Sequence, residues 1–155
     1  VGEDNASKLS LCNQTTKQNL KTWLNKNKMI NDTIDILDAK IINLGIDFEV
    51  IAEAEKDSTQ VLESCITALK ARFASSVVEV GEDFFITDIY NTLNETEGVV
   101  DVVKVSAHKK SGNNYADISF DVNKNLSPDG RYIAIPKNVI WEIKYPNIDI
   151  KGAIK

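Results

Sequence analysis

The sequence has few of the residues that most enzymes and metalloproteins depend on. Its 155 residues include one histidine, His108, and two cysteines, Cys12 and Cys65, which lie far apart. A zinc tetrad or a Cys–His catalytic pair cannot be assembled from this set without unusual ligands. The net charge of −5, from 18 basic and 23 acidic residues, argues against the basic stripe that phosphate contacts require. We therefore expect no metal, no cofactor and no nucleic-acid partner.

Long apolar segments are also missing. The longest apolar runs fall far short of the ~20 residues that a membrane-spanning helix needs. The apolar fraction of 43% and the charged fraction of 26% are typical of a soluble globular protein. A chain of this length can bury enough surface for one core, so we expect a single domain with an appended arm and no membrane contact.

The strongest folding signal is a run of apolar residues at period two in residues 40–52. Successive side chains of a strand point to opposite faces, so this run predicts a long strand with one face on a core. Gly45 lies on the other face, where it predicts a bend or a close backbone approach. The apolar positions are Ile42, Leu44, Ile46, Phe48, Val50 and Ala52.

Three segments have helical spacing. The first runs from Thr15 or Thr16 to about residue 28 and carries Leu20, Trp23 and Leu24 on one stripe. The second starts after Asp57, a predicted N-cap, and has a broad apolar stripe typical of a helix packed on a sheet. The third covers about 83–94. The stripe of the second helix is Val61, Leu62, Cys65, Ile66, Leu69 and Phe73.

The remaining strands are predicted from alternation and β-branched content. They are 33–39, a hairpin of 99–107 and 115–122 joined by a turn at 111–114, two short strands at 132–135 and 139–145, and an edge strand in the tail 147–155. Between them, Ser-Pro-Asp-Gly at 127–130 predicts a type I turn closed by Gly130.

The order of these elements predicts an α+β fold. We expect an antiparallel sheet with two helices on one face, loosely ferredoxin-like, plus an N-terminal helix. The predicted organisation is a flexible arm or linker at 1–14, a lead helix at 15–32 and an α+β domain at 33–155.

No catalytic residue is predicted. Asp47 and Glu49 lie two apart on one strand face, a spacing that paired acid–base chemistry could use, but we expect a solvated sheet face. A hydrolase or a ligand-binding domain built on this face remains the alternative. His108 is expected at an exposed hairpin tip, and the serines have no evident base partner.

Aromatic side chains near element ends and the isoleucine-rich tail are the better candidates for function, although a core position is the default expectation for each aromatic. Large aromatics near element ends are enriched in interface cores as well as in ordinary cores, and terminal segments rarely order unless they dock. The candidate interface residues are Trp23, Phe84, Phe85, Trp141, Tyr145, Ile148, Ile150 and Ile154.

Two blocks of sequence carry a family resemblance. The first is LKTWLNKNKMINDTIDILDAKIINLGIDFEVI, residues 20–51, and the second is IWEIKYPNIDIKGAI, residues 140–154, supported by EGVVDVVKV at 97–105. Together they resemble the C-terminal portion of the baseplate wedge protein of T4-like contractile-tailed bacteriophages, related to the baseplate J-like proteins.

The resemblance implies a structural, non-enzymatic role. Wedge proteins of this family pair through their C-terminal parts and join neighbouring wedges into a ring around the central hub. The implied partners are a second copy of the chain, as a homodimer, and other baseplate wedge subunits. The implied location is the virion, assembled in the cytoplasm of the bacterial host, and the chain is expected to be a C-terminal piece of a longer protein.

Overall fold

The computed structural model describes residues 2–3, 8–29, 31–75 and 78–155. The chain divides into two compact units, Val1–Lys40, which we call the arm, and Ile41–Lys155, which we call the body. The division falls at residue 40 and not at the predicted 32. It lies there because 33–39 forms no strand and joins the arm instead.

The arm contains a small hairpin and one helix. Strand β1 (Gly2–Glu3) pairs antiparallel with β2 (Leu9–Ser10). Helix α1 (Gln14–Asn25) follows, and its N-cap is Asn13, whose Oδ1 accepts the Thr16 amide at 2.7 Å. Asn13 therefore caps the helix in place of the predicted Thr15 or Thr16. The predicted flexible linker at 1–14 falls partly on residues 1 and 4–7, which lie outside the described residues.

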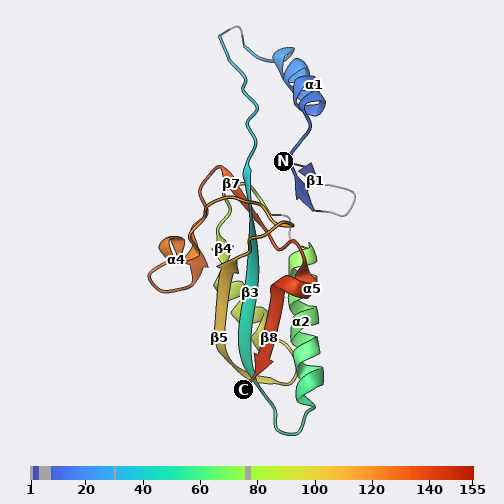
Figure 1. Ribbon diagram of the computed structural model, residues 1–155, viewed down its shortest axis with the longest axis vertical. Helices are drawn as coiled ribbons and strands as arrows, with labels where there is room; N and C mark the ends of the chain where they lie inside the picture. The colour runs from blue at the N-terminus through green and yellow to red at the C-terminus, as the bar shows by residue number, and fades with distance from the viewer. Residues whose placement is uncertain (1, 4–7, 30, 76–77) are drawn as a thin grey trace. The chain divides into compact units, whose positions relative to one another are not determined.

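The body is organised around β3 (Lys40–Ala52), the long strand predicted from sequence (Figure 1). β5 (Val99–Lys109) pairs with it antiparallel, and β7 (Val139–Glu142) joins the same sheet. β8 (Ile150–Ile154) pairs with β3 in parallel, from Ile46 to Val50. The tail is thus a strand as predicted, but the sheet is mixed and not purely antiparallel.

Two helices cover one face of this sheet, which confirms the α+β prediction. α2 (Ser58–Ser75) begins after Asp57, whose Oδ1 accepts the Thr59 amide, and α3 (Ile86–Asn94) follows a short connection. Their apolar stripes meet alternate residues of β3 because a strand presents every second side chain to the same layer. The shared core includes Leu44, Ile46, Phe48, Cys65, Leu69, Ile89 and Leu93, all buried.

Short elements close one end of the body. They are β4 (Phe84–Phe85), α4 (Val122–Asn125), β6 (Tyr132–Ile133), which pairs antiparallel with β4, and α5 (Pro146–Asp149). Phe84 and Trp141 meet edge to face, with ring centroids 4.8 Å apart, and Phe73 stacks on Phe84 at 6.0 Å. This end of the core is therefore aromatic.

The predicted hairpin of 99–107 with 115–122 is wrong in its second half. β5 is present, but residues 116–121 form no strand. β5 pairs with β3 along its length, and the Ala116 amide donates instead to the side chain of Asn43 at 2.7 Å. Alternating side chains fit a strand, but a strand also needs a neighbouring backbone to pair with.

Candidate functional site

The arm exposes large apolar side chains without a core of its own. No residue of α1, all of which the structure describes, is buried. Trp23 is 61% exposed and Leu37 is 86% exposed, although such side chains gain free energy when removed from water. Leu11, Leu20 and Met29 are also exposed. Several large exposed apolar side chains on so short a segment indicate a candidate interaction surface.

Two sides of α1 have different roles. Lys17 and Lys21 form ion pairs with Asp38 and Asp35, which hold the extended segment 33–39 along one side of the helix. Residues three and four apart share a helix face, so Leu20, Trp23 and the half-buried Leu24 form an apolar stripe beside the two lysines, which we call the helix stripe. Surface ion pairs contribute only ~0–1 kcal/mol each, so they orient the segment more than they stabilise it.

In the body, the sheet face away from the helices is charged. Asp47 lies between Ser106 of β5 and Lys151 of β8, and Glu49 lies between Lys104 and Ala153. These residues line a shallow, open depression of about 320 Å³. Binding pockets for small molecules usually enclose most of the ligand, which an open depression of this kind does not.

Asp47 is paired with the histidine of the chain. Its Oδ2 lies 3.2 Å from His108 Nδ1, across the β3–β5 pairing. Both side chains are exposed, so water screens the pair. His108 therefore lies within β5 and not at the tip of a hairpin, and the two side chains lie close to the depression.

One end of β5 carries an exposed apolar cluster that the sequence pattern did not single out. Glu49 pairs with Lys104 but Val50 pairs with Val102, which leaves Val103 as an extra residue in a β-bulge. A second register shift leaves Val100 unpaired beside Asp101. Val100 is 62% exposed, and Val103 and Ile51 are exposed to a smaller degree. We call Ile51, Val100 and Val103 the bulge patch.

A buried carboxylate anchors the C-terminal end of the body. Asp149 is fully buried and accepts hydrogen bonds from the Tyr115 hydroxyl at 2.6 Å and the Tyr145 amide at 2.8 Å. The Lys110 ammonium lies 3.8 Å away. The hydrogen bond to Asp149, with smaller effects of burial and charge, raises the pKa of Tyr115 to about 12. Because both carboxylate oxygens of Asp149 have hydrogen-bond partners, we interpret this side chain as a structural anchor.

Asn43 plays a similar part near the start of β3. Its Oδ1 accepts the Ala116 amide and its Nδ2 donates to Glu142 at 3.1 Å, while its backbone carbonyl accepts the Lys110 amide. Asn43 is buried, so these bonds satisfy its amide and tie an irregular loop to the sheet.

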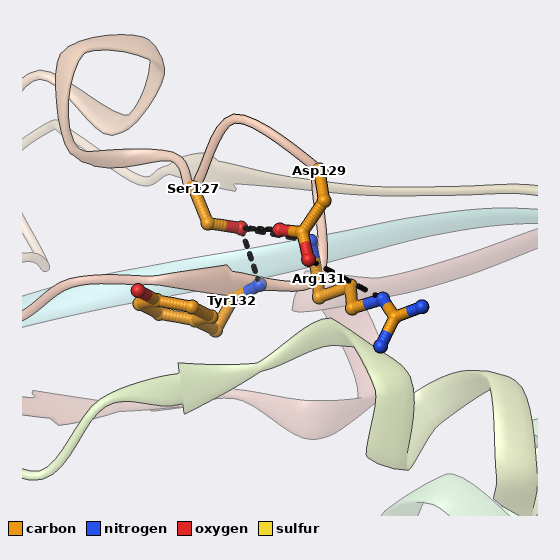
Figure 2. Close-up of polar contacts among 4 residues, drawn as sticks. All are labelled: Ser127, Asp129, Arg131 and Tyr132. Atoms are coloured by element: carbon orange, nitrogen blue, oxygen red, sulfur yellow. Dashed lines mark hydrogen bonds and ion pairs between the residues drawn. The ribbon is translucent and has the colours of Figure 1, made fainter.

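The Ser-Pro-Asp-Gly turn forms as predicted, and Figure 2 shows its polar contacts. Gly130 has φ +70°, and its amide donates to the Ser127 carbonyl. The Ser127 hydroxyl donates to Asp129 at 2.6 Å and accepts the Arg131 and Tyr132 amides (Figure 2). The same hydrogen bond lowers the pKa of Asp129. With two amides on its oxygen, this serine is held as a turn element and not poised as a nucleophile.

The predicted interface residues fall into three groups. Phe84, Trp141 and Ile150 are buried in the body, so they pack the core and offer no surface for association. Their alternation and aromatic character are equally typical of core positions. Tyr145 and Ile154 are half-buried, Tyr145 against the Tyr115 ring. The exposed group is Trp23, Phe85 and Ile148.

Two of the residues that matter most were missed by sequence reasoning. Asn43 and Asp149 are polar residues next to strand positions, and nothing local distinguishes them from solvated ones. A usable signal for Asp149 is its place in a Tyr-Pro-Asn-Ile-Asp run, where Pro146 starts a helical turn that brings the carboxylate back to the Tyr145 amide.

No protein-family model matches the chain, and no curated protein sequence matches it. Among the described residues, no helix has the length and apolarity needed to span a bilayer. Within the same residues, no group of three or more His, Cys, Asp or Glu side chains gathers as metal ligands would.

Proposed function

We propose that this chain is an assembly module that associates with a second copy of itself in the baseplate of a contractile phage tail. Its role is to link wedge subunits into a ring, with other baseplate wedge subunits as further partners and the virion as its location. The support is the resemblance in residues 20–51 and 140–154 together with the surface of the arm. The proposal includes no catalytic step.

The observation that carries the proposal is the exposed apolar surface of the arm. Trp23 and Leu37 are more than half exposed, and α1 has no buried residue on any side. A 12-residue helix is marginal in water without packing, so its stability must come from a surface that covers it. Aromatic side chains of this kind dominate the energetics of protein interfaces. A partner that buries the helix stripe supplies that surface.

Sedimentation velocity at two protein concentrations tests self-association directly. We expect a monomer–dimer equilibrium that shifts toward dimer at the higher concentration. A chain that stays monomeric at both concentrations contradicts the proposal.

Trp23 provides an optical test of the same association. It is exposed, whereas Trp141 is buried, so association should shift the emission of Trp23 to shorter wavelength and leave that of Trp141 unchanged. The Trp23→Phe variant should lose the concentration-dependent shift and retain the spectrum of Trp141.

The contribution of the C-terminal tail can be tested at Ile148. Deleting residues 147–155 removes β8, and a charge at Ile150 falls in the core, so both changes unfold the body and say nothing of an interface. Ile148 is 60% exposed and is the suitable probe. If the tail takes part in association, Ile148→Asp weakens the dimer. Val80→Asp, at an exposed valine elsewhere on the body, serves as the matched control.

The assignment to a virion has its own test. Peptides of this chain should be recovered from purified phage tails in amounts comparable to known tail subunits. Their absence from purified tails, with the chain abundant in the infected cell, contradicts the location but leaves self-association standing.

A second function, as a ligand-binding or regulatory domain, is favoured by the depression lined by Asp47, Glu49, Lys104 and Lys151. It predicts that a small zwitterionic or polar ligand shifts the NMR signals of these residues at submillimolar concentration. Asp47→Asn should then abolish the shifts without changing the mass of the protein in solution.

A further inference from the structure

The helix stripe and the bulge patch are both exposed apolar surfaces with charged borders. The stripe consists of Leu20, Trp23 and Leu24 on α1 of the arm, and the patch of Ile51, Val100 and Val103 at one end of the body sheet. Two exposed apolar surfaces on one chain can cover each other when two copies meet.

The segments around the two surfaces differ in charge. Residues 14–28, which contain the helix stripe, carry four lysines and no acidic residue, and Lys17 and Lys21 among them are paired with Asp38 and Asp35. The bulge patch is bordered by the exposed carboxylates Glu49, Glu53 and Asp101, with Lys104 opposite Glu49 and Lys56 3.9 Å from Glu53. As a whole, the body carries 18 acidic and 12 basic residues, whereas the arm carries 5 acidic and 6 basic. Such complementarity steers association and fixes which surfaces meet.

The β-bulges explain why the patch exists. An extra residue in a strand loses its cross-strand neighbour and turns its side chain out of the regular alternation. Bulges also disrupt edge pairing, and the outer amides of Val102 and Val105 are already occupied by Asp101 Oδ1 and the Tyr90 hydroxyl. This end of β5 is therefore protected against strand addition, so a helix laid on its side chains is the better-suited occupant.

We propose that α1 of one copy packs its helix stripe on the bulge patch of a second copy. In the same dimer, α1 of the second copy packs on the bulge patch of the first. This inference rests on the proposed self-association and specifies its mode. When a two-fold axis relates the two copies, this contact between different surfaces occurs twice, and the assembly closes as a dimer. Trp23 is the central anchor, and Lys26 and Lys28, just after the helix, face the carboxylates around the patch.

The test uses full-length variants and sedimentation equilibrium. Trp23→Ser removes the anchor, and Val100→Lys places a positive charge in the patch against a lysine-bearing helix. Each should weaken dimerisation by about tenfold or more, as central aromatic anchors and misplaced charges do. Val80→Lys, at a similarly exposed valine outside the patch, should leave dimerisation within about twofold. Leu20→Ser repeats the arm variant in case Trp23→Ser alters the fold, which circular dichroism checks.

Mixing the two variants gives the decisive result. A mixed dimer of Trp23→Ser and Val100→Lys keeps one intact contact, since the arm of the Val100→Lys copy meets the patch of the Trp23→Ser copy. The mixture should therefore associate more tightly than either variant alone, and less tightly than the unmodified chain.

The outcomes separate this inference from the proposed function. If the unmodified chain dimerises but neither variant weakens the dimer, or the mixture is no tighter than its components, the arm-to-patch contact is overturned and self-association stands. If the unmodified chain is monomeric, with Trp23 emission already at short wavelength, the arm covers its own body and both proposals fail.

Discussion

The arm and the body of this chain reach order in opposite ways. The body buries alternate residues of β3 against α2 and α3 and leaves mainly charged groups on its open face. The arm has a helix with no buried residue and several exposed apolar side chains, among them Trp23. Folding must offset a conformational entropy cost of ~1–2 kcal/mol per residue, which the body can do alone. The order of the arm therefore depends on packing against another surface, because its helix buries no residue of its own.

The largest effect is expected in the aromatic end of the body core. Phe84→Ala should lower the free energy of unfolding by about 3–5 kcal/mol, because it leaves a cavity between Phe73 and Trp141. Urea unfolding followed by circular dichroism measures it. Phe85→Ala, one residue on but exposed, is the control and should cost much less. Similar losses for both variants would break the contrast between buried and exposed positions.

The buried carboxylate comes next. Asp149→Ala should lower the free energy of unfolding by about 3 kcal/mol, because it strands the Tyr115 hydroxyl, the Tyr145 amide and the Lys110 ammonium. As a surface control, Asp88→Ala removes an exposed pair with Arg72 and should cost less than ~1 kcal/mol. An unfolding curve unchanged by Asp149→Ala would show that the C-terminal end is not anchored as described.

The body and the arm each contain a segment without helix or strand, and Asn43 holds the segment of the body. Residues 116–121 and 33–39 both lack helix and strand, but only the first has an amide held by a buried side chain. Hydrogen exchange should therefore be slower at Ala116 than at residues 33–39. Asn43→Ala should remove that protection and cost about 1–3 kcal/mol, because it leaves the Ala116 amide unsatisfied. Equal exchange in the two segments would erase this distinction.

Tyr115 should give the body a stability loss at high pH. Its pKa is raised in the folded state to about 12, above the ordinary 10, so folding favours its neutral form. This contribution is complete below pH 10 and is lost as the pH rises from 10 to 12. The urea midpoint of the unmodified chain should fall over that interval more steeply than that of Tyr115→Phe. Parallel curves for the two proteins would contradict the prediction.

The smallest effect is expected in the arm. Trp23→Ala should change the free energy of unfolding of the body by less than ~0.5 kcal/mol at low protein concentration, because Trp23 is exposed. The same variant should weaken association, which makes the arm important for assembly and not for folding. A loss of 2 kcal/mol or more in a monomeric protein would show that the arm is part of the body's fold.

Much of the fold was predictable where the pattern was long and regular. The six apolar residues of β3 at period two and the broad stripe of α2 fix which faces are buried, because side-chain direction follows from backbone geometry. Ile150 and Ile154 correctly indicated a strand in the tail. Residues 115–122 have the same alternation and form no strand, because strand formation depends on an available neighbour.

The candidate surfaces were less predictable. Trp23 and Trp141 were both predicted as interface residues, yet Trp23 is exposed and Trp141 is buried. The two cannot be separated by residue type, since aromatics serve cores and interfaces alike. Val100 and Val103 lie in a β-branched run that reads as ordinary strand, and only the register with β3 makes them extra residues.

Composition and local periodicity predict the α+β composition and the buried face of β3, because both are local properties of the sequence. Tertiary structure alone decided the parallel pairing of β8, the bulges that expose Val100 and Val103, and the burial of Asn43 and Asp149. The physical reason is that register and polar burial depend on groups distant in the chain. Asn43 and Ala116, 73 positions apart, become partners only when the sheet has formed.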